Sequence, residues 1–435
     1  MFQSFNERLL DMPKTILNKE VQKQIKEMKE VDVLVGIPSF NNARTIPHVV
    51  RAVSAGLAKY FPKHRTLLVN SDGGSTDGTP ELVKKTSLED LDVLLMEHPV
   101  YPVHKIVTPY IGVPGKGSAF RTIFRIAQAL NTKACAVVDS DLRSITPEWI
   151  ELLIEPVLFR GYDFVAPYYK RHKYDGTITN SIVYPLSRAL YGKRIRQPIG
   201  GDFGFSGRLA SHYLKKKVYD TDVARFGIDI WMTTTAVADG FKTCQSFLGA
   251  KIHQAKDPGA DLSDMLVQVV GSVFHLMEAY QEVWAKVSSS EPIKEFGFQF
   301  EVGLEPIHVN LERMLDNFKQ GVTDLIPIWQ KILSNDILVQ LKEIASLNVM
   351  EFRLPIELWV KIIYDFALAY HHRTMSRTHI LKSLTPLYLG RCASFVNETV
   401  DSNADEVEEK IEALCREFEN QKIYLLTNWD KSKRR

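Results

Sequence analysis

Cysteine is scarce in this sequence. Cys135, Cys244, Cys392 and Cys415 are the only cysteines among 435 residues, and no two of them show the C-x-x-C spacing. Scattered cysteines of this kind are typical of reduced, mostly buried thiols. The sequence therefore excludes a disulfide framework and a cysteine-based zinc site, and it favours a cytoplasmic protein.

The sequence also lacks long apolar runs and a strong net charge. No stretch approaches the roughly 18 apolar residues that a membrane-spanning helix needs, and the charged N-terminus shows no apolar segment typical of a signal peptide. With 54 basic and 52 acidic residues the net charge is +2, which gives no reason to expect nucleic-acid binding. We therefore expect neither a membrane span nor a nucleic-acid partner, and the sequence leaves a homodimer open.

Two residue patterns follow one another along the chain. Up to about residue 256, short apolar runs alternate with helical patterns, which predicts an α/β domain with a mostly parallel sheet. Beyond that point, apolar residues recur at spacings of three and four, which predicts amphipathic helices. Because the chain exceeds the usual size of one domain, we expect a helical lead-in (1–30), an α/β domain (31–256) and an α-helical domain (257–435).

The expected elements follow from these periodicities. Strands are expected at 31–37, 67–70, 93–96, 134–138, 162–168 and 243–248, and helices of the α/β domain at 45–60, 77–87, 117–131 and 147–159. A long helix is expected at 262–287, followed by helical segments at about 307–334, 355–372, 377–397 and 403–420.

Two carboxylates follow the apolar run at 134–138. Asp139 and Asp141 flank Ser140 at the expected C-terminal end of a strand, which is the edge where open α/β sheets bind ligands. Two carboxylates one residue apart suit a hard divalent cation, and such a cation suits a diphosphate. A D-x-D triplet alone is weak evidence because chance and helix-capping pairs are common, so its surroundings decide the interpretation.

Glycine-rich segments upstream strengthen that interpretation. Gly115-Lys116-Gly117 opens a helical pattern, where glycines let the backbone approach an anion and Lys116 adds a positive charge. Its spacing is not that of a P-loop, and a tight turn with an exposed lysine is the alternative. Asp72, which precedes two glycines, can accept a hydrogen bond from a base or ribose, or it can simply form a turn.

Three downstream positions complete the candidate set. Gly200-Gly201-Asp202 suggests a loop folded close to a ligand. Asp229 stands at the start of a helical run, where a carboxylate is often only a cap. A lone histidine is usually structural, but His253 follows a strand-like segment between two lysines and is a candidate third metal ligand.

Together these motifs resemble those of nucleotide-sugar glycosyltransferases of the GT-A type. The segments 37–42 and 72–79 resemble the N-terminal pattern of family 2 enzymes. The segments 114–117, 138–141, 197–202, 226–229 and 252–253 resemble retaining enzymes that make glucosylglycerate, mannosylglycerate or glucosyl-3-phosphoglycerate. The resemblance covers roughly residues 31–275, and the helical C-terminal part carries no sharp motif. It implies a Rossmann-like GT-A domain that binds a nucleotide sugar, followed by an α-helical domain.

The resemblance also implies a role for each site residue. The nucleoside would be held by Pro38, Ser39, Asn41 and Asp72, and the diphosphate by Lys116. Asp141 and His253 would bind Mg²⁺ or Mn²⁺. The ribose and donor sugar would be served by Asp139, Ser140, Gly200 and Gly201, with Asp202 and Asp229 as catalytic candidates. Asp229 would lie near the acceptor hydroxyl, and Thr177, Thr179 and Lys251 would bind the acceptor.

The implied reaction is metal-dependent transfer of glucose or mannose, with retention, from a UDP- or GDP-sugar to the 2-hydroxyl of D-glycerate. Phosphoglycerate-using relatives carry a Gly-Arg-Val-Thr loop, whereas the comparable stretch here is Gly176-Thr177-Ile178-Thr179. Because the arginine is missing, we expect unphosphorylated glycerate. A glucosyl-3-phosphoglycerate synthase, a transferase with another small acceptor and a non-catalytic nucleotide-sugar sensor remain alternatives. A sensor would be expected to lose the metal ligands or Asp229, and the sequence keeps them all.

Overall fold

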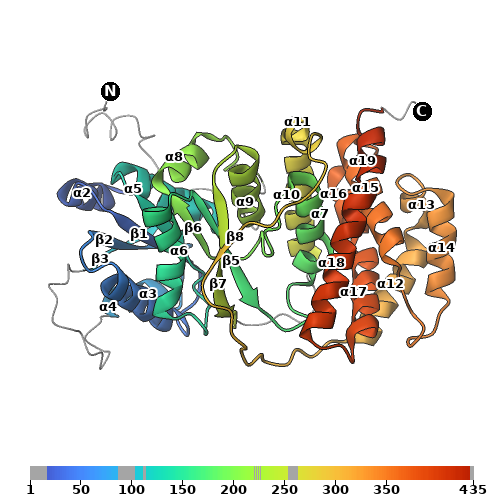
Figure 1. Ribbon diagram of the computed structural model, residues 1–435, viewed down its shortest axis with the longest axis horizontal. Coiled ribbons are helices and arrows are strands. Elements are labelled where there is room, and N and C mark those ends of the chain that lie inside the picture. Colours follow the sequence, from blue (N-terminus) through green and yellow to red (C-terminus); the bar gives the residue numbers. More distant parts are fainter. Residues whose placement is uncertain are drawn as a thin grey trace. The chain divides into compact units, whose positions relative to one another are not determined.

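The computed structural model describes residues 17–86, 103–110, 114–219, 221, 223, 225, 227–252 and 263–431 (Figure 1). Internal contacts divide the chain into two compact units. The first unit comprises Met1–Lys170, Ile199–Gln254 and Ile293–Gly303, and the second comprises Arg171–Pro198, Ala255–Pro292 and Leu304–Arg435. The chain passes from the first unit to the second after Gln254, two residues from the predicted boundary at 256/257. No sequence pattern predicted that 171–198 belong to the second unit or 293–303 to the first. The proposed domain limits therefore remain a prediction.

The first unit contains a mixed sheet of eight described strands. They are β1 (Val33–Ser39), β2 (Thr66–Asp72), β3 (His104–Pro109), β4 (Ala134–Val137), β5 (Phe164–Lys170), β6 (Phe203–Ser206), β7 (Thr243–Ala250) and β8 (Lys294–Phe296). Their order is β3-β2-β1-β4-β6-β5-β7-β8, and every described pairing is parallel except those of β6 with β4 and β5. The mostly parallel sheet predicted from the sequence is confirmed.

Burial explains why the strands read as apolar runs. All residues of β1, β2 and β4 are buried, as expected for strands covered on both faces. The helices of this unit are α2 (Lys19–Met28), α3 (Ile46–Tyr60), α4 (Thr79–Lys85), α5 (Lys116–Ala129), α6 (Pro147–Arg160), α8 (Gly207–Lys215) and α9 (Ile228–Ala238). The apolar faces of α3 and α6 share one core with β1 and β4. The four helices predicted for the α/β domain correspond to α3, α4, α5 and α6, and their predicted ends lie within about two residues of the observed ones.

Some sequence-based expectations need correction. Strands β3, β6 and β8 were not predicted, because they are short and have polar residues or glycine among their apolar ones. The expected strand at 93–96 lies outside the described residues. The helix expected at 262–287 ends at Ala279, because Tyr280 leaves helical geometry (φ −121°, ψ 27°) before a short helix resumes at Gln281.

The second unit is helical apart from its connections. It contains the π-helix η1 (Thr179–Val183), α7 (Tyr184–Tyr191), α10 (Ser263–Ala279), α11 (Gln281–Trp284), α12 (Leu311–Asp324), α13 (Ile326–Trp329), α14 (Asn335–Ala345), α15 (Ile356–His371), α16 (Arg377–Ser383), α17 (Thr385–Thr399), α18 (Ala404–Asn420) and α19 (Lys422–Trp429). The segment 171–198 belongs here because its basic side chains bind the C-terminal helices: Arg188 pairs with Glu412 and Glu419, and Arg196 with Glu408. The α-helical C-terminal region predicted from the sequence is confirmed.

Two features bear on the composition-based predictions. All four cysteines are buried and free of disulfides. Within the described part of the chain, no helix combines the length and apolarity required to cross a bilayer.

Candidate active site

The strand order places the candidate residues of the first unit at one edge of the sheet. The chain runs from β1 through β2 to β3 on one side, and β4 then adds to the other side of β1. Ligands of open α/β sheets bind beyond the carboxyl ends of the strands at such a reversal. Ser39 ends β1 and Asp139 follows β4, so the two segments predicted to bind the nucleotide sugar meet at this position.

Hydrogen bonds between the loops after β1 and β4 fix this edge. The Ser140 hydroxyl donates to the Asn42 side chain at 2.8 Å, and the Thr45 hydroxyl donates to the Ser140 carbonyl at 2.7 Å. Asn41 has a left-handed backbone (φ 54°), and its side-chain oxygen accepts from the Thr76 amide at 2.9 Å. Asn42 belongs to the predicted segment 37–42, but Thr45 was missed as a supporting residue, because only the folded arrangement brings Ser140 next to it.

Asp72 is fully engaged by its own neighbourhood. Its carboxylate accepts hydrogen bonds from the hydroxyls of Ser39 (2.8 Å) and Ser75 (2.7 Å) and from the amides of Gly74 (2.9 Å) and Ser75 (2.7 Å). A carboxylate offers about four acceptor sites, so this geometry favours the turn interpretation. Pro38 pairs with Ser71 in the register of β1 and β2. The nucleoside-binding roles of Pro38, Ser39 and Asp72 stay predictions.

A buried charge cluster forms the centre of the site. Lys116, at the start of α5, places its ammonium 2.7 Å from Asp139 and 3.2 Å from Asp229. The three side chains are between 13% and 22% exposed, so solvent screens their interaction only weakly. Asp229 does not cap α9, because no side chain caps that helix and its carboxylate faces Lys116 instead. The G-K-G segment is thus more than an exposed turn.

One oxygen of Asp229 has an unusual environment. Lys116 lies 3.2 Å from both carboxylate oxygens, but the geometry makes a hydrogen bond to only one of them. The other oxygen is buried and accepts no hydrogen bond from the described residues. Because buried acceptors are normally paired, this oxygen is available to a donor such as a ligand hydroxyl.

The charges shift one another's titration. Burial opposes the ionised form of Asp139, but Lys116 and Lys251 outweigh it and hold the pKa of Asp139 well below its usual range. Burial would lower the pKa of Lys116, yet Asp139 and Asp229 raise it above the ordinary value. Burial raises the pKa of Asp229; Lys116 opposes this rise, and the negative charge of Asp139 adds to it. Two neighbouring carboxylates therefore differ in proton affinity, a pattern common at functional sites.

Lys251 and Asp202 extend the charge cluster beyond Asp139. The Lys251 ammonium lies 2.8 Å from Asp139, 2.8 Å from Asp202 and 2.8 Å from the Gly200 carbonyl. Asp202 is fully buried and also accepts from the Asp139 amide at 2.8 Å and from the Tyr169 hydroxyl. Lys251 was predicted to bind the acceptor carboxylate, and this role stays a prediction. Tyr169 was missed because it lies just beyond the strand expected at 162–168 and contacts Asp202 only in the folded chain, 33 residues away in sequence.

The candidate metal ligands are only partly described. Asp141 is half-buried and follows β4 by four residues, while His253 lies outside the described residues. The residue before His253 is held against the acidic loop: the Ile252 carbonyl accepts from the Arg143 amide at 2.8 Å, and its amide donates to Ser144 at 2.9 Å. Within the described residues, no three acidic, histidine or cysteine side chains form a group that could hold a metal ion.

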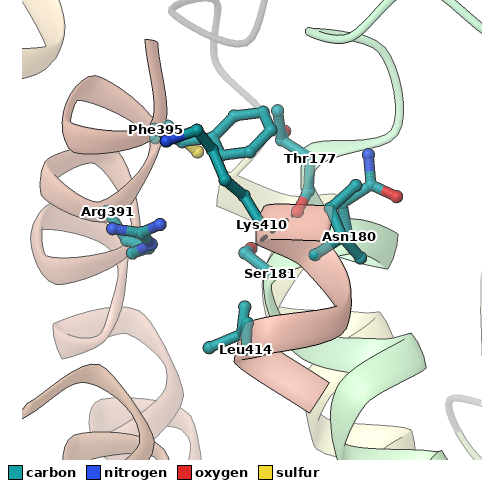
Figure 2. Close-up of a pocket in the computed structure, with 9 residues that line it drawn as sticks. Thr177, Asn180, Ser181, Arg391, Phe395, Lys410 and Leu414 are labelled. Carbon is teal, nitrogen blue, oxygen red and sulfur yellow. Dashed lines mark hydrogen bonds between the residues drawn. The ribbon is translucent and has the colours of Figure 1, made fainter. Parts of the chain in front are cut away.

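The predicted acceptor residues Thr177 and Thr179 belong to the second unit, where both are buried. The Thr177 hydroxyl lies 2.5 Å from the Tyr388 hydroxyl and beside a pocket between η1, α17 and α18. Figure 2 shows Lys410 extending from α18 toward Phe395 on α17, with Thr177 on the opposite wall. The acceptor role of these two threonines stays a prediction.

Comparison with known proteins identifies a segment of the chain that includes β2 to β6. Residues 34–210 match the family model described as glycosyl transferase family 2. This segment is a glycosyltransferase domain. The match covers the sheet edge that carries Ser39, Lys116, Asp139 and Asp202, and it confirms the predicted enzyme class and the GT-A type of fold.

Individual relatives are distant. Glucosyl-3-phosphoglycerate synthase of Petrotoga mobilis is 24% identical over 277 residues, which cover 60% of this chain and 78% of the relative. An uncharacterised protein of Methanocaldococcus jannaschii is 28% identical over 145 residues; these cover 33% of this chain and 49% of that protein, so the chain spans about half its length. A crystal structure of Mycobacterium tuberculosis glucosyl-3-phosphoglycerate synthase with Mn²⁺, UDP and glucosyl-3-phosphoglycerate is similar with a TM-score of 0.43 and 19% identity, covering 59% of this chain and 84% of that one.

Proposed function

We propose that this protein is a metal-dependent, retaining hexosyltransferase that moves glucose or mannose from a UDP- or GDP-sugar to the 2-hydroxyl of D-glycerate. The observation that carries the proposal is the cluster of Lys116, Asp139 and Asp229 at the sheet reversal of a glycosyltransferase domain. It combines a cation suited to a diphosphate with a carboxylate oxygen that accepts no hydrogen bond from the described residues.

Lys116 is proposed to bind the departing diphosphate. Cleavage of the glycosidic bond to the diphosphate develops negative charge on the leaving oxygen, and a preorganised cation stabilises it best in a site with little water. By the yardstick of an oxyanion-hole donor, such a group contributes about 3–4 kcal/mol to the transition state. The Lys116 side chain is 19% exposed, compared with 5% for Lys251.

Asp229 is proposed to orient the acceptor. The oxygen that accepts no hydrogen bond from the described residues can accept one from the glycerate hydroxyl, and its raised pKa makes Asp229 a better proton acceptor than an ordinary aspartate. The fully buried Asp202 is proposed to contribute indirectly, by holding the Asp139 backbone and its own turn, 200–202, in place. Retention requires attack from the face that the diphosphate leaves or a covalent intermediate, and both routes fit this set of side chains.

The donor set suits a hard divalent cation. Asp141 and His253 would hold Mg²⁺ or Mn²⁺, because carboxylate oxygen and imidazole nitrogen are accepted ligands and Ile252 is tied to the loop that carries Asp141. When bound, such an ion neutralises diphosphate charge and acts as a Lewis acid. The complexes of the mycobacterial enzyme with Mn²⁺ and UDP are consistent with this proposal.

A phosphorylated acceptor is the second candidate. The Petrotoga relative, matched over 60% of this chain, is a glucosyl-3-phosphoglycerate synthase. Against it stands Thr177 in place of the arginine of the phosphate-binding loop, because a threonine hydroxyl cannot replace a bidentate guanidinium. We therefore propose glycerate as the preferred acceptor.

A donor and acceptor screen tests the proposal. UDP- and GDP-linked glucose and mannose are incubated with Mg²⁺ or Mn²⁺, each with glycerate, with 3-phosphoglycerate and without an acceptor. We expect a hexosylglycerate product from at least one donor. Binding of a nucleotide sugar without transfer to either acceptor and without hydrolysis would instead indicate a sensor.

A further inference from the structure

Lys251 directly follows β7 and differs from Lys116 in how its ammonium is used. An ammonium has three hydrogen-bond donors, and those of Lys251 go to Asp139, Asp202 and the Gly200 carbonyl, each at 2.8 Å. The residue is only 8% exposed. Lys116 is more open, and its third contact, the Gly201 carbonyl, is at 3.5 Å. The two lysines of the cluster are therefore not equivalent.

The partners of Lys251 connect two segments that are distant in sequence. Asp202 accepts from the Lys251 ammonium with one oxygen and from the Asp139 amide with the other, both at 2.8 Å. Between these contacts lies Gly201, where an added Cβ would come within 2.2 Å of the Asp139 carboxylate. The distance between the 139–141 segment and the 200–202 turn is thus limited in both directions. The Gly201 backbone prevents a closer approach, and the hydrogen bonds of Lys251 and Asp202 prevent separation.

A bound acceptor carboxylate would have to compete for these donors. Taking one from Asp202 would leave a fully buried carboxylate short of its counter-charge, which is strongly unfavourable. Taking one from Asp139 would release the carboxylate that faces Lys116.

We propose that Lys251 is a positioning residue of the donor site, which sets the spacing between Asp139 and the 200–202 turn, and that it does not bind the acceptor. This inference rests on the proposed function, in which Asp139 and the turn serve the donor. It predicts that loss of Lys251 changes donor binding and donor cleavage, and that it leaves acceptor binding unchanged.

The test compares Lys251→Gln and Lys251→Arg with a control at the other end of the same strand. Lys242 immediately precedes β7, and its ammonium lies 4.2 Å from the Tyr162 ring centre, outside the cluster, so Lys242→Gln is the matched control. For each protein, the measurements are KM for donor and for acceptor, kcat for transfer, donor hydrolysis without acceptor, and calorimetric Kd for UDP and GDP with Mn²⁺.

For Lys251→Gln we expect transfer and donor hydrolysis to fall together by at least tenfold, nucleotide Kd to rise about tenfold, and acceptor KM to stay within twofold. Lys251→Arg keeps the charge and should recover part of the donor-side loss; it also serves if the Gln variant does not fold. A tenfold rise in acceptor KM with unchanged nucleotide Kd and hydrolysis would overturn the proposal. If wild type binds nucleotide but makes no product, the proposed function fails, and the Kd comparison alone decides the role of Lys251.

Discussion

Gly201→Ala is the most direct perturbation of the charge cluster. Gly201 has a left-handed backbone (φ +88°), and an added Cβ would lie 2.2 Å from the Asp139 carboxylate oxygen and 3.1 Å from the Lys251 ammonium. The alanine variant therefore combines backbone strain with a steric displacement of Asp139.

The backbone strain should lower stability, and the displacement of Asp139 should lower the rate of transfer. A left-handed conformation costs an L-residue about 1–2 kcal/mol, which should appear as lost stability. The Asp139 carboxylate must retreat from 2.2 Å to the 3.4 Å at which ordinary contact begins, a movement of about 1 Å. A misplacement of about 1 Å can cost about 10²-fold in rate, which corresponds to about 2.7 kcal/mol of transition-state stabilisation.

Gly240→Ala provides the matched control. Gly240, in the turn between α9 and β7, also has a left-handed backbone (φ +77°), but an added Cβ would meet nothing within 4 Å. Denaturant unfolding should show a loss of stability for both variants, larger in Gly201→Ala because its Cβ also displaces a carboxylate that is paired with two lysines, and kcat/KM for transfer should fall about 10²-fold only in Gly201→Ala. Equal kcat/KM in the two variants would show that the position of Asp139 does not matter for the reaction.

Further predictions address the metal, the stereochemistry, the acceptor and the second unit. EDTA should abolish transfer and Mg²⁺ or Mn²⁺ restore it, whereas full activity of Asp141→Ala in metal-free buffer would contradict the ligand assignment. Proton NMR of the fresh product should show the α anomer from an α-linked donor; a β coupling would refute retention. Glycerate should exceed 3-phosphoglycerate in kcat/KM by about one to two decades, since the missing charge-assisted contact is worth roughly 1.5–3 kcal/mol, and the reverse order would overturn the acceptor assignment. Burial lowers the pKa of Lys422 from 10.5 to about 8; the unfolded chain then binds more protons between these values, so unfolding free energy should rise from pH 8 to 10.5. Lys422→Met should flatten that rise, and parallel stability curves would exclude the effect.

The sequence predicted those parts of the fold that local periodicity determines. The runs that became β1, β2 and β4 are apolar because both faces of these strands are buried. The position of Asp139 at the sheet edge followed directly from the end of such a run. By contrast, β6 is four residues long with a glycine at its second position, and this glycine lies where a Cβ would meet the Leu153 carbonyl at 2.0 Å. Its antiparallel insertion next to β4 depends on packing that no local pattern reports.

The candidate site shows the same division. Residue type and loop position were enough to single out Lys116, Asp139 and Asp229, which the structure brings together. The engagement of Lys251 could not be predicted, because it arises from segments 112 and 49 residues apart in sequence. From the sequence alone, a lysine near a ligand site is interpreted as an anion-binding residue. Only the structure shows that the Lys251 ammonium donates hydrogen bonds to other groups of the protein.

Charge balance provides an independent reason to expect a cation at this site. Asp139, Asp202 and Asp229 carry three negative charges when ionised, and Lys116 and Lys251 supply two positive ones. These five groups therefore leave an excess of one negative charge, and the half-buried Asp141 nearby in sequence adds to it. A diphosphate would bring further negative charge into a site where solvent screens weakly, so binding would be unfavourable without another positive charge. The raised pKa of Asp229 can remove one negative charge by protonation, but a proton there would occupy an oxygen that is proposed to accept the acceptor hydroxyl. A divalent ion held, as proposed, by Asp141 and His253 would offset the diphosphate charge and would leave Asp229 ionised, which is why the metal and the acceptor proposals support each other.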